Sequence, residues 1–175
     1  MREGVPSDGA AVHLGLGSNM GDKVGHLCEA VRRLKSIGNV EALSSLYLTE
    51  PVGFANQDCF LNAAVCLRTH LTPREVLEAV LAMEREMGRV RTVKYGPRTI
   101  DIDLLLWGEM AIDEPGLSLP HPRLQERLFV LAPLAEIAPA LRHPVLGQVM
   151  AALRDAKAEE GGVERYGSFP PLGIT

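Results

Sequence analysis

Two aspartates, Asp101 and Asp103, are separated by one residue within residues 99–107, TIDIDLLLW. Side chains alternate faces along a β-strand, so both carboxylates would project from one face, with their Cα atoms about 6.6 Å apart. Two ionised carboxylates this close repel in a partly buried site unless a cation lies between them. Two carboxylates are enough protein ligands for Mg²⁺, which keeps several water ligands and takes others from the phosphates of a substrate. The same D-x-D pattern occurs on the polar face of edge strands, but the apolar run at residues 104–107 favours a central strand.

A basic segment, residues 88–98 (GRVRTVKYGPR), directly precedes this pair and has four basic residues in eleven positions. Arginine offers planar, bidentate donors to a phosphate, and Mg²⁺ bridges the same oxygens from the other side. The glycines and the proline indicate a loop that can close over a nucleotide and expel water. The alternative interpretation is a solvated basic loop.

Other polar candidates lie before and after these segments. Glu84 falls on the apolar stripe of an expected helix, and a buried acid needs a partner. It could cap loop amides, accept a salt bridge from Arg89 or Arg91, or contact a substrate. His121, bracketed by prolines, is either an ordinary loop histidine or a neutral or charged phosphate donor. Two further candidates follow it on an expected helix, Arg127 and Phe129.

The elements that must position these residues follow a β-α-β-β-α-β order, which predicts an α+β, ferredoxin-like sandwich with an antiparallel sheet and C-terminal additions. The second helix has the clearest start, a T-x-x-E capping box at residues 72–75 with proline at the first helical position. Asp22 is a plausible N-cap of the first helix. The expected strands are residues 11–15, 40–48, 59–68 and 99–107, the expected helices begin at residues 22 and 72, and further helical stretches are expected at 123–137 and 145–158.

The chain of 175 residues, 46% of them apolar, suits one core, so we expect a flexible leader at residues 1–10 and a single domain at 11–175. A net charge of −4 argues against nucleic-acid or acidic-membrane partners. No apolar run approaches the roughly 20 residues that span a bilayer. The three cysteines, Cys28, Cys59 and Cys66, form no C-x-x-C pair, which indicates reduced thiols in a cytoplasmic protein. No pattern indicates an oligomeric state.

Five segments together resemble the 6-hydroxymethyl-7,8-dihydropterin pyrophosphokinase family over roughly residues 12–139. The most specific is G-P-R-T-x-D-x-D followed by P-H, in this order and at this spacing. The segments are GLGSN at 15–19, TEPVG at 49–53, FLNAA at 60–64, GRVR at 88–91 and GPRTIDID at 96–103.

This resemblance implies transfer of diphosphate from ATP to a pterin alcohol in folate biosynthesis, with AMP as the leaving group. It implies two Mg²⁺ ions held by Asp101 and Asp103, and a catalytic set that adds Arg89 and Arg98. The implied ATP-binding residues are Glu84, Arg89, Arg91, Arg98, Leu104, Ser118, His121 and Arg127. The implied pterin-binding residues are Thr49, Pro51, Val52, Asn62 and Asp101, with Phe60 and Phe129 as a stacking pair. The sequence does not choose between Asp101 as the acceptor of the hydroxyl proton and a metal that lowers the pKa of the hydroxyl directly.

Some positions depart from the family pattern. The basic loop is one residue shorter, Tyr95 stands where tryptophan is often found, and Gly116 stands where some members carry arginine. These departures bear on lid motion and on the adenine side of the site. The tail at residues 159–175 has no assigned role, although residues 163–169 could add an edge strand.

Two alternatives belong to other classes of protein. Gly15 and Gly17 between a strand and a helix suggest a dinucleotide-binding turn, but the third glycine of G-x-G-x-x-G falls on Met20. Such a domain would bind NAD(P) without Mg²⁺. The second alternative is a non-catalytic ferredoxin-like module that binds nucleotide, against which the intact Asp101, Asp103, Arg98 and His121 argue.

Overall fold

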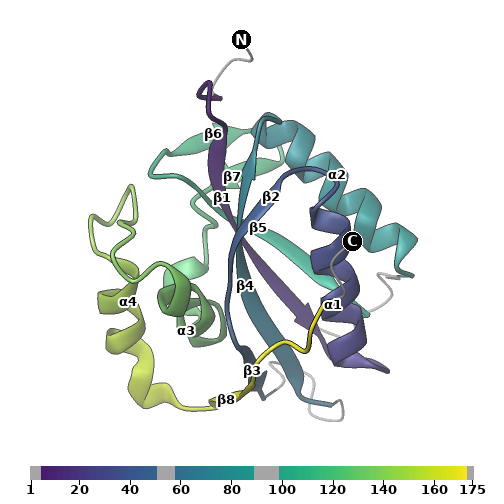
Figure 1. Cartoon of the computed structure of the whole chain (residues 1–175). Coiled ribbons are helices and arrows are strands. Elements are labelled where there is room, and N and C mark those ends of the chain that lie inside the picture. Colours follow the sequence, from purple (N-terminus) through teal and green to yellow (C-terminus); the bar gives the residue numbers. More distant parts are fainter. Residues whose placement is uncertain (1–4, 51–57, 89–98, 173–175) are drawn as a thin grey trace.

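A computed structural model describes residues 5–50, 58–88 and 99–172 of the chain (Figure 1). It is a mixed α/β fold built on an antiparallel sheet. Its elements, in chain order, are β1 (Ala10–Ser18), α1 (Lys23–Leu34), β2 (Asn39–Leu43), β3 (Leu46–Thr49), β4 (Phe60–Thr69), α2 (Pro73–Glu86), β5 (Asp101–Trp107), β6 (Ile112–Glu114), β7 (Leu117–Leu119), the 3-10 helix η1 (Leu124–Glu126), α3 (Leu128–Ile137), α4 (Met150–Lys157), the 3-10 helix η2 (Ala158–Glu160) and β8 (Val163–Gly167).

The main sheet has the strand order β5-β1-β4-β3-β8, and β2 also pairs with β4. The strand predicted at residues 40–48 is two strands, because Ser44 and Ser45 interrupt it. The Ser44 hydroxyl accepts a 2.8 Å hydrogen bond from the Ala64 amide, and the Ser44 amide donates to the Ala64 carbonyl at 2.9 Å. The Ser44 hydroxyl thus replaces one backbone carbonyl as the acceptor in the ladder of hydrogen bonds. As a result, β2 and β3 pair separately with β4.

β5 lies at the edge of the described sheet, so the prediction of a central strand was wrong. Its apolar residues are nevertheless buried, because they pack in the apolar clusters on the two faces of the sheet. Groups outside the sheet bond to its outer edge. The Glu84 carboxylate accepts a hydrogen bond from the Ile102 amide at 3.0 Å, and the His121 amide donates to the Leu105 carbonyl at 2.8 Å. This edge is therefore covered by α2 and by the segment after β7, which protects it from pairing with another chain.

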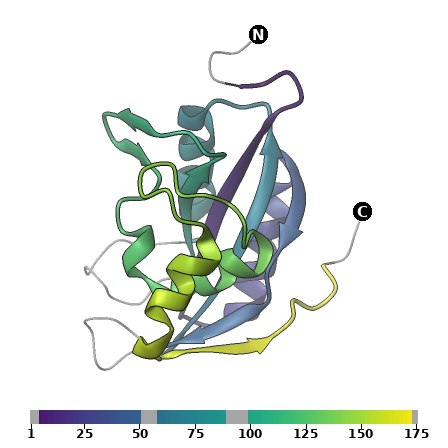
Figure 2. The same ribbon diagram turned by 90° about the vertical axis from the view of Figure 1, so that its left-hand side faces the viewer.

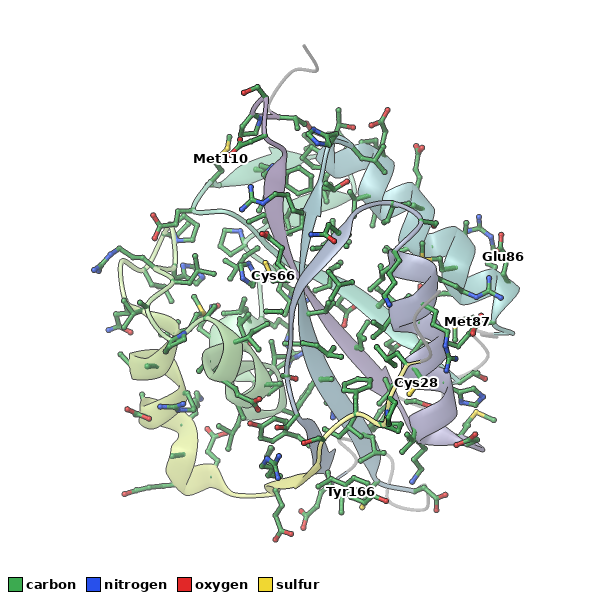
Figure 3. All side chains as sticks on the ribbon, in the orientation of Figure 1. Cys28, Cys66, Glu86, Met87, Met110 and Tyr166 are labelled. Atoms are coloured by element: carbon green, nitrogen blue, oxygen red, sulfur yellow. The ribbon has the colours of Figure 1, made fainter. Side chains whose placement is uncertain are left out.

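Helices α1 and α2 cover one face of the sheet, and their predicted starts are confirmed. The Asp22 carboxylate accepts from the Gly25 amide at 3.0 Å, and Thr72 and Glu75 form the reciprocal capping box. An ion pair of 2.7 Å joins Arg33 of α1 to Glu86 of α2, where Figure 3 shows the two helices side by side. Among the described residues of the expected leader, Val5 is buried against this core, and β1 already starts at Ala10.

Helices α3 and α4 cover part of the opposite face, and Figure 2 shows them in front of the sheet with α1 behind it. They form a second apolar cluster with Ala64, Leu105 and Leu106. The edge strand suggested for residues 163–169 is confirmed as β8, which pairs with β3. The C-terminal helices α3 and α4 thus form a second helical layer, on the other face of the sheet. Strand β8 adds one strand to the sheet.

All three cysteines are free, as predicted. Figure 3 shows Cys28 on α1 and Cys66 on β4, in separate parts of the fold. Within the described residues, no helix has the length and apolarity needed to cross a bilayer.

Acid is expected to destabilise the fold through His13 of β1. This side chain is buried, and burial lowers its pKa from 6.5 to about 4, while the Glu41 carboxylate opposes the shift. As the pH falls from 6.5 to about 4, the unfolded chain binds a proton that the folded chain excludes. The free energy of unfolding should therefore decrease over this window by about 2 to 3 kcal/mol from this group.

Urea unfolding of the wild type and of His13→Leu at pH 7 and pH 4.5 measures this contribution. We expect the variant to lose less stability between the two pH values than the wild type. His70→Gln, at an exposed histidine, is the matched control. It should lose as much stability between pH 7 and pH 4.5 as the wild type does. Equal losses in His13→Leu and the wild type would contradict the assignment.

Candidate active site

The face of the sheet opposite α1 and α2 brings the predicted polar residues into register. Gly17 of β1 pairs with Asp101 of β5 on one side and with Asn62 of β4 on the other. Residues that pair directly across an antiparallel sheet point to the same face. Asp103 lies two residues from Asp101 and pairs with Gly15, so both carboxylates project to this face, as predicted.

The two glycines of β1 form the floor between these side chains. A Cβ atom at Gly17 would lie 2.8 Å from Oδ1 of Asn62, and one at Gly15 would lie 3.4 Å from a Leu105 methyl group. Both glycines are inside β1 and not in a strand-to-helix turn. The dinucleotide-binding interpretation of G-x-G is therefore wrong, and the glycines instead leave space above the sheet.

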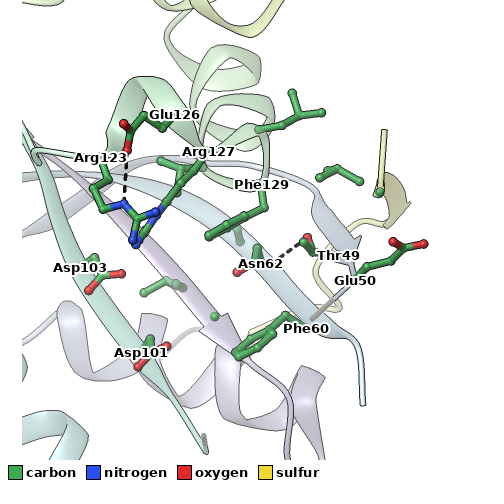
Figure 4. Close-up of a pocket in the computed structure, with 18 of the residues that line it drawn as sticks. Thr49, Glu50, Phe60, Asn62, Asp101, Asp103, Arg123, Glu126, Arg127 and Phe129 are labelled. Carbon is green, nitrogen blue, oxygen red and sulfur yellow. Dashed lines mark hydrogen bonds and ion pairs between the residues drawn. The ribbon is translucent and has the colours of Figure 1, made fainter. Parts of the chain in front are cut away.

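A cavity of about 700 Å³ opens above this floor and contains most of the residues predicted to bind a pterin. The Phe60 and Phe129 rings lie on either side of Asn62 in Figure 4. The Asn62 amide nitrogen donates a 2.8 Å hydrogen bond to the Thr49 hydroxyl, which fixes the orientation of this buried amide. The cavity thus offers two aromatic faces and one oriented amide to a flat, polar ring.

Basic side chains border the same cavity beside the aspartates. Arg127 directly precedes α3, and its guanidinium carbon lies 5.7 Å from the centre of the Phe129 ring, within range of a cation–π contact. Arg123 donates to the Glu126 carboxylate at 3.2 Å (Figure 4). Sequence reasoning missed Arg123 and Glu126, which lie in a loop and a short 3-10 helix without a motif. The cavity therefore carries cationic groups opposite its carboxylates.

His121 is held as a neutral donor. Its Nδ1 accepts a hydrogen bond from the Arg123 amide at 3.1 Å. Burial, and then the nearby Arg127 and Arg123 charges, lower the pKa of His121 below its usual value. A neutral ring whose Nδ1 is an acceptor carries its proton on Nε2. Of the two forms that the sequence allowed, this geometry favours the neutral one.

A second cavity of about 340 Å³ lies on the α2 side of β5, and Asp103 and His121 line both cavities. Its walls are mainly apolar, and four residues predicted to bind ATP belong to them, Glu84, Leu104, Ser118 and His121. The Ser118 hydroxyl donates to Asp113 at 3.4 Å. Gly116, with φ of 75°, also lines this cavity.

Glu84 has a structural function in this wall. It is buried, and its carboxylate accepts from the Ile102 amide at the open edge of β5. Glu84→Ala would leave that buried amide unpaired, so we expect the free energy of unfolding to fall by about 1 to 3 kcal/mol. Glu84→Gln keeps an acceptor oxygen, so its free energy of unfolding should fall by less than that of Glu84→Ala. Urea unfolding measures both, and the exposed Glu78→Ala on the same helix is the control.

A loss in Glu84→Gln as large as that in Glu84→Ala would show that the carboxylate charge, rather than the bond to Ile102, stabilises the wall.

The remaining predicted site residues lie outside the described residues. These are Pro51, Val52, Arg89, Arg91 and Arg98, together with Tyr95 of the predicted lid. The described residues contain no cluster of three or more metal-binding side chains, so a cation here would rely on Asp101, Asp103 and ligand oxygens. This donor set fits Mg²⁺, which binds through one or two carboxylates and substrate phosphates.

The fold places two cavities on either side of Asp103 and His121, which line both of them, so a carboxylate lies between two places where ligands could bind. The family model of 7,8-dihydro-6-hydroxymethylpterin-pyrophosphokinase (HPPK) matches residues 13–139. The chain belongs to this family.

Curated relatives and solved structures agree with this membership. The chain is 46% identical over 155 residues to a Methylorubrum extorquens protein named 2-amino-4-hydroxy-6-hydroxymethyldihydropteridine pyrophosphokinase, covering 87% of this chain and 96% of that protein. A Bacillus subtilis protein of the same name is 49% identical over 127 residues, covering 71% and 76%. The fold resembles the crystal structure of wild-type Plasmodium falciparum HPPK-DHPS with pterin and p-hydroxybenzoate, with a TM-score of 0.71 at 17% identity. That match covers 94% of this chain and 46% of the Plasmodium chain, so this chain spans about half of its length.

Proposed function

We propose that the protein transfers diphosphate from ATP to the hydroxymethyl group of 6-hydroxymethyl-7,8-dihydropterin, giving AMP and the pterin diphosphate in folate biosynthesis. The observation that carries this proposal is the junction at Asp103 and His121, which line both cavities. A group transferred between ligands in the two cavities would pass beside these two side chains. The names of the relatives support the same reaction.

The larger cavity suits the pterin. Its ring would lie between Phe60 and Phe129, with the Asn62 amide reading its polar edge, since offset aromatic stacking is favourable. Family resemblance adds Thr49 and the backbone around Pro51 and Val52. The apolar second cavity suits the adenine side of ATP, with Leu104 and Ser118 in its wall.

The triphosphate would cross the junction between the two cavities. There Asp101 and Asp103 would hold two Mg²⁺ ions, which when bound neutralise charge on the phosphates. Arg127 and the neutral Nε2–H of His121 would bind phosphate oxygens, and we assign Arg89, Arg91 and Arg98 to the same anion from the family pattern. The pterin hydroxyl oxygen forms a bond to the β-phosphorus and gives up its proton, to Asp101 or to solvent, while the bond from this phosphorus to the α–β bridging oxygen breaks and AMP leaves with that oxygen. Alignment and charge stabilisation account for most catalysis in such transfers.

We also propose the ferredoxin-like arrangement for the βαββαβ part of the chain. If β2 and β3 are counted as one strand, the fourth strand lies beside the first, and the first beside the third. Each β-α-β unit is thus split by a strand of the other, as in that arrangement. We assign residues 11–175 to one domain, and we place it in the cytoplasm because its thiols are free.

Chromatographic assay of AMP tests this function. ATP, MgCl₂ and the protein should form AMP only when the pterin alcohol is present, and EDTA should stop the reaction. A non-catalytic nucleotide-binding module would bind ATP but form no AMP under any of these conditions, which would contradict the proposal.

A further inference from the structure

The carboxylate of Glu136 connects α3 to the start of β3, away from the Asp103–His121 junction between the two cavities. Glu136, in the last turn of α3, accepts hydrogen bonds from the Ser45 amide at 2.9 and 3.1 Å and from the Ser45 hydroxyl at 3.1 Å. It also accepts one from the Tyr47 hydroxyl at 2.6 Å. Burial and the bond to Glu136 raise the pKa of Tyr47 to about 12, so this phenol remains a donor at neutral pH. Glu136 is thus bonded to the Ser45 amide and hydroxyl just before β3 and to the Tyr47 side chain within it.

The C-terminal strand holds the other edge of β3. Arg165 of β8 donates to the Ser45 hydroxyl at 3.1 Å, so that hydroxyl connects Arg165 to Glu136. The Glu50 amide, just after β3, donates to the Gly162 carbonyl at 3.1 Å. This segment follows residue 139, where the match to the family model ends. A part of the chain beyond that match therefore completes the hydrogen bonding of β3.

The elements that these hydrogen bonds connect also form walls of the larger cavity. α3 carries Phe129 near its start, and β3 carries Thr49 at its end, where Thr49 orients Asn62. β3 has only four residues, so few bonds fix its position between β4 and β8. Residues 160–163 also line the cavity directly. A shift of β3 relative to α3 would change the spacing between the aromatic wall and the Thr49–Asn62 pair.

We propose that Glu136 and Arg165 are positioning residues for the pterin end of the site, acting through Ser45. This inference rests on the proposed function. They touch no substrate; they hold α3, β3 and β8 in the one arrangement in which Phe129, Thr49 and Asn62 fit the same ring. Displacement of about 1 Å at a binding wall can reduce rates substantially even when the change is remote.

Steady-state kinetics of Arg165→Ala and Glu136→Ala tests this proposal. We expect the KM for the pterin alcohol to rise about tenfold in each variant, with the KM for ATP changed less than about twofold. Glu136→Gln keeps one acceptor oxygen and should recover part of the loss. Arg68→Ala is the matched control, because Arg68 also bonds one glutamate, Glu41, and one backbone carbonyl, at the other end of β4.

The double variant Glu136→Ala/Arg165→Ala separates a shared network from two independent effects. Residues in one network are non-additive, so the double variant should raise the pterin KM by much less than the product of the two single increases. If Arg165→Ala and Glu136→Ala lower the thermal midpoint but change the pterin KM no more than Arg68→Ala does, the positioning role is overturned. An inactive wild type contradicts the proposed function, whereas an active wild type with unchanged KM values in the variants contradicts only this inference.

Discussion

Asp103→Asn is expected to lower kcat/KM for diphosphate transfer by at least about 10²- to 10³-fold, the usual loss when one preorganised charge-stabilising group is removed. Asp103 lines both cavities, so in the proposed reaction its carboxylate would lie where the two substrates meet. Asparagine keeps the shape and removes the negative charge that would hold Mg²⁺ on the phosphates. Asp101→Asn removes the second carboxylate of the same face and should have a loss of similar size.

Initial rates of AMP formation across a range of MgCl₂ concentrations measure this effect. Both variants should need more Mg²⁺ than the wild type to reach half of their own maximal rate. Asp155→Asn is the control, since Asp155 is an exposed residue of α4 that pairs with Arg154. Thermal midpoints of all variants show whether folding is retained. Activity within tenfold of the wild type in a folded Asp103→Asn would rule out its assigned role.

Gly17→Ala is expected to lower kcat/KM for the pterin by about 10- to 100-fold. Its new Cβ would lie 2.8 Å from Oδ1 of Asn62, closer than real contacts allow. Asn62 cannot turn aside without breaking its 2.8 Å bond to Thr49. The substitution would therefore both raise the cavity floor and displace the Asn62 amide proposed to read the ring, and overpacking of this kind typically costs about 1 to 3 kcal/mol.

Gly15→Ala is the matched control on the same strand and the same face. Its Cβ would meet a Leu105 methyl group at 3.4 Å, which is an ordinary van der Waals contact. We expect a change in pterin kcat/KM of less than about threefold, and KM values for both substrates should be determined for both variants. Equal decreases in pterin kcat/KM for Gly15→Ala and Gly17→Ala would contradict the assignment of Gly17 to the floor of the pterin cavity. A change in the KM for ATP alone would contradict it as well.

The features that could be predicted from the sequence are those that local rules determine. The capping box at Thr72 depends on four successive residues, and the shared face of Asp101 and Asp103 depends only on strand alternation. The same alternation places Phe60 and Asn62 together in the larger cavity. These interpretations needed no knowledge of which elements lie side by side.

The features that sequence reasoning missed depend on contacts between distant segments. The apolar run of β5 indicated a central strand, but Glu84 and the His121 segment cover its outer edge instead. The break between β2 and β3 arises from the Ser44 hydroxyl bonding to β4, twenty residues away in the chain. No motif marks residues 160–163, and they line the larger cavity only because β8 pairs with β3.

Phosphorus NMR of the wild-type reaction tests the central claim most directly, because it identifies which phosphorus the pterin oxygen attacks. With ATP, MgCl₂ and 6-hydroxymethyl-7,8-dihydropterin, we predict that the three ATP resonances disappear together while AMP and a diphosphate ester of the pterin form in equal amounts. Formation of ADP and a pterin monophosphate would show attack at the γ-phosphorus. That result would contradict diphosphate transfer to the pterin alcohol.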